Sequence, residues 1–313
     1  MSRFTNLSSD PLLRNFAKDA SQAAIRPIAD FLAPRVEVPE ITGRYKIYDA
    51  KNRYHRPATR RELNGRATRI GFTASDGTYT LDPQALDFPI PNANGMSDET
   101  LRYHAMYGTQ LLADSAGLVH EAEVIDAALA AVGAGTDSNF TSGSVDPVAI
   151  LDAQILAVMK AAKNGAPVKV LFGATALQRF RNNALVRGRI TAGSKKSSNG
   201  SGEVSIQIGD VSNLLFGNPA CEVSLYVEDD AAEGIAESIS FLLDTAILIF
   251  AASDRPNTMD PSFMKTFVPM GGFMVPGIYQ TEDGRDEVLK MDWSTEVKVT
   301  NSAACARINA TAA

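Results

Sequence analysis

The side chains that could support catalysis are few and widely separated along this sequence. It contains three histidines, His55, His104 and His120, and two cysteines, Cys221 and Cys305. His104 and His120 share one predicted helix but are too far apart along it to bind one metal ion without further donors. We expect structural or surface roles for the histidines and reduced, packed thiols for the cysteines.

Recognised catalytic motifs are equally scarce. Gly133 and Gly135 follow a predicted helix rather than a strand, and no Gly-Lys-Ser/Thr comes after them, so a phosphate-binding loop is not indicated. No Gly-x-Ser-x-Gly nucleophile motif occurs. The acidic run at 228–233 lacks the spacing of a calcium loop. We therefore predict no catalytic, cofactor-binding or metal-binding residues, and a protein that is not an enzyme.

Composition is that of a folded protein with real cores. The chain has 313 residues, 45% hydrophobic and 21% charged, with a net charge of −6. The acidic balance argues against a general nucleic-acid binder. The first thirty residues lack the apolar core of a secretory signal. Residues 239–252 are too short and too interrupted, by Asp244, to span a membrane, so we expect two core strands there and no membrane partner.

One segment is strongly basic. Residues 44–69 carry nine positive charges and two acids, a net +7, which leaves −13 for the rest of the chain. A basic projection on an acidic body suits contact between copies of the same molecule. A solvated charged loop is the alternative interpretation, because charge runs commonly are that.

The first ninety-five residues hold too little apolar surface to bury themselves. Residues 1–35 read as an arm, in which Pro11, Pro27 and Pro34 prevent one long helix. We expect this arm to be ordered only by lying on something else. Residues 36–95 read as an extended β-hairpin, because β-branched and aromatic residues flank a polar stretch.

A long helix is predicted over residues 98–132. Apolar and small residues recur along it at spacings of three and four, acids lie in its first turn, and Gly133 and Gly135 follow its end. At 1.5 Å per residue it would be about 50 Å long. Its small residues allow close packing against a sheet or a neighbour.

The remainder follows an α/β pattern. Asp146 and Pro147 predict the start of a helix, and residues 168–172 predict a short buried strand. A helix is expected over 174–181, a polar loop over 191–202, and a helical turn near 211–216. Strands are expected at the following positions: 204–208, 222–227, 239–243, 246–251, and several after residue 253.

This order of segments resembles the Hong Kong 97 phage capsid fold over residues 20–313. The resemblance is carried by these phrases: FLAPRVEVPEITGRYKIYDAKNRYH (31–55), YTLDPQALDFPIPN (79–92), VKVLFGATALQRFRNNALVRGRI (168–190), VSNLLFG (211–217), ILIFAASDRPNTMDPSFMKTFVPMGG (247–272) and WSTEVKVTNSAACARINA (293–310). Each phrase is weak alone, and their order and spacing together are more specific.

The resemblance implies an α+β fold with an N-terminal arm (1–35) and an extended β-hairpin loop (36–95). It implies a peripheral domain with the long spine helix (96–145 and 255–313) and an α/β axial domain (146–254). The implied function is a structural subunit that self-assembles into an icosahedral head shell around double-stranded phage DNA. The arm begins near the start of this sequence, so a cleaved scaffolding extension is not expected; no covalent crosslinks are predicted.

The resemblance also implies partners. We expect many copies of the chain itself, a scaffolding protein and a portal during assembly, a possible decoration protein, and non-specific contact with packaged DNA, without cofactors. The expected location is the virion, after assembly in the host bacterial cytoplasm. As a hypothesis, basic loop residues meet acids on a neighbour's spine helix: Arg53, Arg56, Arg60 and Arg61 with Asp114, Glu121 and Glu123.

Three alternatives remain open from the sequence. An encapsulin-like compartment shares the fold and packages enzymes rather than DNA. An α/β hydrolase or transferase would need a clustered nucleophile and base. A nucleic-acid-binding module built on the basic hairpin would bind DNA tightly as an isolated subunit, with strong salt dependence.

Overall fold

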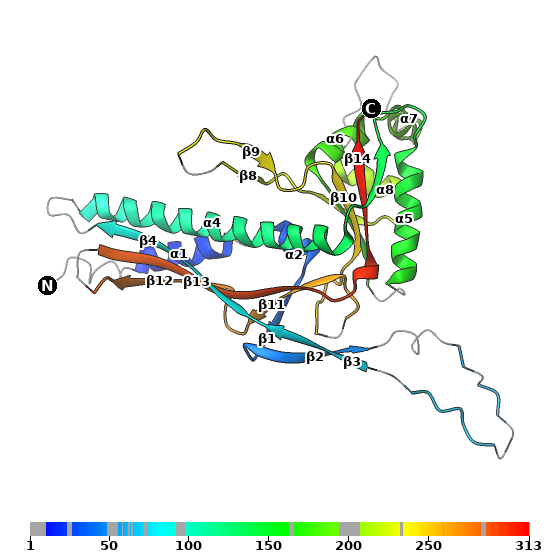
Figure 1. Cartoon of the computed structure of the whole chain (residues 1–313), viewed down its shortest axis with the longest axis horizontal. Coiled ribbons are helices and arrows are strands. Elements are labelled where there is room, and N and C mark those ends of the chain that lie inside the picture. The colour runs from blue at the N-terminus through cyan, green and yellow to red at the C-terminus, as the bar shows by residue number, and fades with distance from the viewer. Residues whose placement is uncertain are drawn as a thin grey trace.

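Two β-sheets, each covered by helices, organise the molecule (Figure 1). The computed structural model describes residues 11–23, 27–48, 56–57, 59–61, 63, 65–71, 74–91, 98–162, 166–193, 207–231, 234–258, 260–282 and 286–312. Within those ranges no helix is both long and apolar enough to cross a bilayer.

The first sheet is built around one long strand near the C-terminus. Its strands are β1 (Arg35–Val38), β4 (Asp82–Pro91), β11 (Met264–Pro269), β12 (Met274–Gln280) and β13 (Asp286–Val299). The first part of β13 pairs with β4 on one side and β12 on the other, and its last four residues pair with β11. β1 joins the far edge, parallel to β11. The sheet therefore unites strands from three distant parts of the chain.

The long helix α4 (Asp98–Val132) lies on this sheet and has the predicted bounds. Leu101 and Leu112 pack with Met291 and Trp293 of β13 in a shared apolar cluster. Small buried residues of α4, such as Ala105, bring the helix axis close to the sheet. The chain leaves the helix through two glycines with positive φ, 71° and 74°, which side chains other than glycine rarely adopt.

The second sheet carries the larger core. Its strands, in spatial order, are β5 (Thr136–Asn139), β14 (Cys305–Thr311), β10 (Ala246–Ala251), β6 (Val168–Phe172) and β7 (Ala220–Val223). Around it lie α5 (Pro147–Ala161), α6 (Ala174–Asn182), α7 (Ala184–Gly193), α8 (Ile208–Leu214) and the 3₁₀ turn η2 (Ser302–Ala304). Every residue of β6 and β10 is buried, as expected for strands covered on both faces. The Asp146 carboxylate caps α5 by accepting from the Val148 amide at 3.2 Å, which confirms the predicted helix start.

Two predictions about this half are wrong. Residues 239–243 do not form a core strand: β9 (Ile239–Phe241) is exposed and pairs only with β8 (Val227–Asp229) in a two-stranded ribbon. An apolar run alone cannot show whether sheet neighbours will cover it. Ile208 begins α8 instead of ending a strand, because the Asp210 carboxylate accepts from the Gln207 amide and closes the helix start. Residues 194–206 lie outside the described part.

Two strands that the predicted division places with α4 pair outside the first sheet. Both β5 and β14 lie in the second sheet, where β14 pairs with β5 on one side and with β10 on the other. The pairing of β14 with both neighbours depends on contacts far apart in sequence, so local patterns could not reveal it.

The arm packs against its own chain, which corrects the expectation that it must lie on something else. Helix α1 (Pro11–Ala23) packs on α4 and β12, and α2 (Pro27–Leu32) packs on α4. Ile28, Ala29 and Leu32 belong to the larger core, and the Phe31 ring meets Phe250 of β10 edge-on at 5.6 Å. In its described stretches, 15–21 and 27–35, the arm therefore buries side chains against its own molecule.

Candidate functional site

The extended hairpin is anchored at its base and projects beyond it (Figure 1). Its strands are β2 (Thr42–Tyr48) and β3 (Ala74–Thr80). The Tyr45 and Tyr79 rings lie 5.3 and 5.0 Å from the ring of Phe267 on β11. Opposite each tyrosine stands a glycine, Gly77 and Gly43, and a Cβ at either would fall within 2.5 Å of the tyrosine ring or hydroxyl. The contacts of the two tyrosines with Phe267 hold the ribbon to the body. The two tyrosine–glycine pairs favour one register of its strands.

Beyond this base the loop buries almost nothing. Among its described residues, Arg56, Arg60 and Arg61 are exposed, as are the apolar side chains of Leu63 (97%) and Ile70 (71%). Arg53 and His55 lie outside the described part. An exposed loop that combines arginines with large apolar side chains is suited to covering another surface. We call residues 44–69 the basic loop.

The three acids predicted to receive the basic loop have different environments. Asp114 is exposed on α4. Glu123 is half-buried and accepts from the Gln84 amide at 2.8 Å. Glu121 is fully buried and accepts from the backbone N–H of Ala29 at 3.2 Å. Glu121 is therefore wrong as a partner for a neighbour's arginine: its carboxylate supports the start of α2 within the same chain.

Beside Glu121, the imidazole of His120 is buried in an arrangement that the sequence did not reveal. Its ring meets the Phe273 ring at 4.9 Å, and the Arg35 guanidinium lies 5.4 Å from the centre of the same ring. Within the described residues neither ring nitrogen has a hydrogen-bond partner. Burial, with a smaller contribution from the charge of Arg35, lowers the pKa of His120 from 6.5 to about 4. The ring is therefore neutral at pH 7 and serves as packing.

The two cysteines lie in the second sheet, on strands separated by β10 and β6. Both are free and half-buried. Burial raises the pKa of each thiol to about 12, so neither forms an appreciable nucleophilic thiolate at neutral pH. The described ranges contain no group of three metal-ligating side chains. In the acidic run, one oxygen of Asp229 accepts from the Ala231 and Ser238 amides and so supports the local turn.

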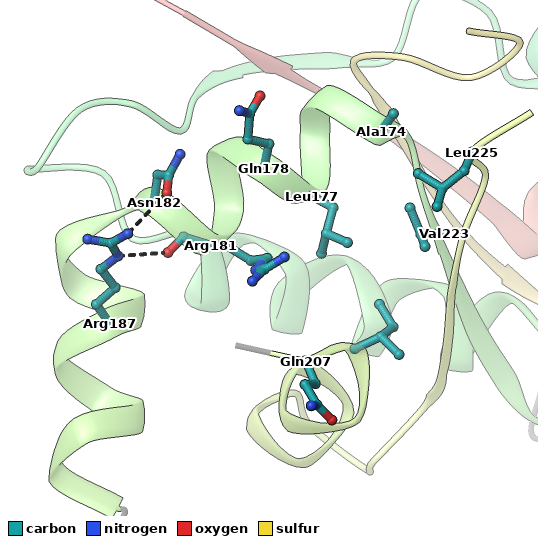
Figure 2. A pocket seen from close by; sticks show the side chains of 10 residues that line it. Ala174, Leu177, Gln178, Arg181, Asn182, Arg187, Gln207, Val223 and Leu225 are labelled. Atoms are coloured by element: carbon teal, nitrogen blue, oxygen red, sulfur yellow. Dashed lines mark hydrogen bonds between the residues drawn. The ribbon is translucent and has the colours of Figure 1, made fainter. Parts of the chain in front are cut away.

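An open pocket of about 660 Å³ lies between α6, α7, α8 and the end of β7 (Figure 2). Its lining residues are Ala174, Leu177, Gln178, Arg181, Asn182, Arg187, Gln207, Ile208, Val223 and Leu225. None of these described residues is acidic, and two are arginines. The Arg187 guanidinium donates to the Arg181 carbonyl and to the Asn182 side-chain oxygen, both at 3.2 Å. We call this site the α6–α8 pocket.

Solved structures with the same fold exist, although no family model and no curated protein matches the sequence. A phage-related protein from Bordetella bronchiseptica superposes with a TM-score of 0.67 at 16% identity, over 96% of each chain. The capsid of cyanophage P-SCSP1u has a TM-score of 0.52 at 10% identity, over 90% of this chain and 87% of that one. The SrpI encapsulin of Synechococcus elongatus has a TM-score of 0.53 at 13% identity, over 91% and 88%.

These similarities extend over nearly the whole chain and confirm the predicted fold class. The molecule has the α+β, Hong Kong 97-like fold, with its long helix, projecting hairpin and α/β half. At identities this low the similarity establishes the fold alone. What the molecule does has to be argued from its exposed surfaces.

Proposed function

We propose that this chain is the major capsid subunit of a tailed bacteriophage, which self-assembles into an icosahedral shell enclosing double-stranded DNA. The observation that carries the proposal is the basic loop. Arg60, Arg61 and Leu63 are exposed on a segment that projects from the body instead of folding onto it. A loop of net charge +7 on a chain that is otherwise −13 fits a surface of the same molecule.

The proposed role needs no strong single contact. Each basic loop covers a limited area of a neighbour, and an interface of that size is individually weak. Closure of many copies into a shell raises the effective concentration of every contact, so modest interfaces give a durable particle. The arm stabilises the subunit from within, because α2 is already part of the larger core.

The proposed loop contact pairs Arg56, Arg60 and Arg61 with acids on the outer face of α4 in a neighbour. Asp114 is the accessible candidate; Glu123 is partly covered, and Glu121 is excluded by its burial. Arg53 remains part of the hypothesis from sequence. We also retain the division into arm, extended loop, peripheral domain and axial domain, with β5 and β14 moved to the axial domain.

Further partners follow from the same proposal. Assembly would involve a scaffolding protein and a portal, with a decoration protein as an optional addition. Packaged DNA would be contacted without sequence specificity. The subunit would assemble in the host bacterial cytoplasm and reside in the virion, in a structural role without catalysis.

A second candidate is the shell of a protein-filled compartment. It is favoured by the SrpI encapsulin, whose TM-score of 0.53 is as high as the 0.52 of the cyanophage capsid. The fold therefore does not separate the two shells. Their contents do, because a phage head holds DNA and this compartment holds protein.

Negative-stain microscopy of the purified full chain tests the proposal. We expect uniform polyhedral particles, with or without a co-expressed scaffold, and nuclease-sensitive DNA in particles recovered from infected or induced cells. Particles filled with protein instead would support the compartment. Monomers under all solution conditions would contradict both shell functions.

A further inference from the structure

The β8–β9 ribbon presents an apolar face that its own chain does not cover. Val227 pairs with Phe241 and Asp229 with Ile239, so these four side chains share one face. Val227, Phe241 and Ile239 are 44%, 43% and 64% exposed. Ser240 lies on the opposite face. A two-stranded ribbon is marginal in water by itself, so an uncovered apolar face on it calls for a partner.

The ribbon is also strongly acidic. Residues 227–241, which we call the acidic ribbon, contain five acids and neither lysine nor arginine. Asp230 and Asp229 are exposed, and Ile235 near the tip is 70% exposed. The partner surface should therefore combine apolar area with positive charge.

The α6–α8 pocket has that composition. Leu177, Ile208 and Val223 provide its apolar lining, and Arg181 and Arg187 provide positive charge without an acidic lining residue. In Figure 2 the Leu177 side chain points between α6 and α8, the Arg181 side chain extends from α6 toward Leu177, and Arg187 lies on α7. The pocket is therefore complementary to the acidic ribbon in charge and in apolar character.

The ribbon does not fill the pocket of its own molecule. Leu225, just before β8, lines the pocket, whereas Val227, Ile239 and Phe241 do not. Figure 1 shows the ribbon leaving the second-sheet half beside α6 and running outward on one side. We propose that the acidic ribbon of one copy docks into the α6–α8 pocket of the next copy, so that successive copies close into a ring. The inference rests on the proposed shell function and names one of its contacts.

This geometry explains why the contact would build rings rather than pairs. Ribbon and pocket are different surfaces, so the interface is head-to-tail, and such an interface repeats until the rotation closes. One ribbon covers far less area than a stable dimer needs, so two copies would separate readily in solution. In a closed ring every copy is held on two sides.

Disulfide trapping in assembled particles tests the contact directly. In the Ile239→Cys/Ile208→Cys variant, mild oxidation should give a ladder of covalently linked copies on a denaturing gel. The matched control is Ser240→Cys/Ile208→Cys, which places the thiol on the opposite ribbon face and should give no ladder. Each single variant controls for Cys221 and Cys305. Intact shells without a ladder would overturn this inference and leave the shell function standing; a chain that forms no shells would overturn both.

A charge placed on each ribbon face gives a second measurement. Ile239→Asp should reduce particle yield by roughly tenfold, because its carboxylate would be driven into the apolar lining of the pocket. Ser240→Asp adds the same charge on the opposite face and should assemble as wild type. Circular dichroism of the subunits verifies folding. Equal yields from the two variants would overturn the proposed docking.

Discussion

The ring of Phe88 on β4 lies so close to Gly108 on α4 that a Cβ atom at position 108 would be 2.4 Å from its Cδ1 atom. No real Cβ tolerates such a contact, so this pair determines how closely the long helix approaches the first sheet. The helix can follow the strand at this distance only because position 108 has no side chain. This close approach predicts whether an alanine at position 108 stabilises or destabilises the subunit.

Gly108→Ala should destabilise the subunit, although alanine is normally better than glycine in a helix by about 1 kcal/mol. Overpacking against Phe88 costs about 1–3 kcal/mol and outweighs that gain. The control is Gly188→Ala on α7, where a Cβ would meet nothing within 4 Å and stability should rise by up to about 1 kcal/mol. Urea midpoints measure both. In the Gly108→Ala background, Phe88→Leu should restore most of the lost stability. If Gly108→Ala and Gly188→Ala stabilise the subunit alike, the clash with Phe88 is refuted.

Asn183 should be one of the most sensitive polar positions. Its buried amide donates to the carbonyls of Phe140, Ser142 and Val145 at 2.9, 3.1 and 3.3 Å, and its oxygen accepts from the Leu185 amide. Asn183→Ala removes all four of these bonds from a buried position, so we expect a loss of about 3 kcal/mol. Asn182→Ala, at the exposed neighbouring position, should change stability by less than about 1 kcal/mol. Denaturant titration compares the two, and similar losses would contradict the bonding assigned to Asn183.

His120 should make the subunit sensitive to acid. Its folded-state pKa of about 4 lies below the unfolded value near 6.5, so the unfolded chain binds more protons between these values. Stability contributed by the neutral ring is complete above pH 6.5 and is lost as the pH falls toward 4. His120→Phe, which retains a ring against Phe273, removes this loss. The stability difference between the two proteins should shift in favour of the variant by about 3 kcal/mol in acid.

The measurement for His120 is the free energy of unfolding at several pH values from 4 to 8. The carboxylates that titrate in this range change the free energy of unfolding of both proteins equally, so the difference between the proteins isolates the histidine. A pH-independent difference would show that the buried ring does not titrate as described.

Charge reversal in the basic loop should impair assembly without unfolding the subunit. Arg60→Glu/Arg61→Glu places two acids where the proposed contact needs positive charge, and both positions are exposed. We expect few or no particles by microscopy and a wild-type thermal transition. Arg60→Lys/Arg61→Lys retains the charge and serves as the control. Normal particles from the glutamate variant would remove these two arginines from the assembly contact.

Local patterns were sufficient for elements whose limits are defined by adjacent residues. The long helix begins and ends at Asp98 and Val132 as predicted, because an acidic first turn and Gly133 act within one turn of each end. Asp146 and Pro147 likewise mark the start of α5. The strand β6 was also recognisable, because four of its five residues are apolar and burial on both faces selects such a run.

Patterns failed where burial depends on another part of the chain. Ile239 has an apolar side chain typical of a core strand, yet β9 pairs only with β8 in a two-stranded ribbon, and the residue is 64% exposed. Glu121 has the side chain of a surface acid, yet α2 brings the Ala29 amide against it and buries it. In both cases the deciding contact is with a segment distant in sequence.

By itself, the sequence determined the long helix, the order of the elements and the anomalous charge of the basic loop. The order of the elements in turn indicated the fold class. These features depend on residue type and on spacing within a few turns or strands. Only the tertiary structure decided that the arm packs inward, that β14 joins the second sheet, and that an apolar, acidic ribbon stands beside an arginine-lined pocket. Burial is a relation between distant segments, and it exists only once the chain has brought them together.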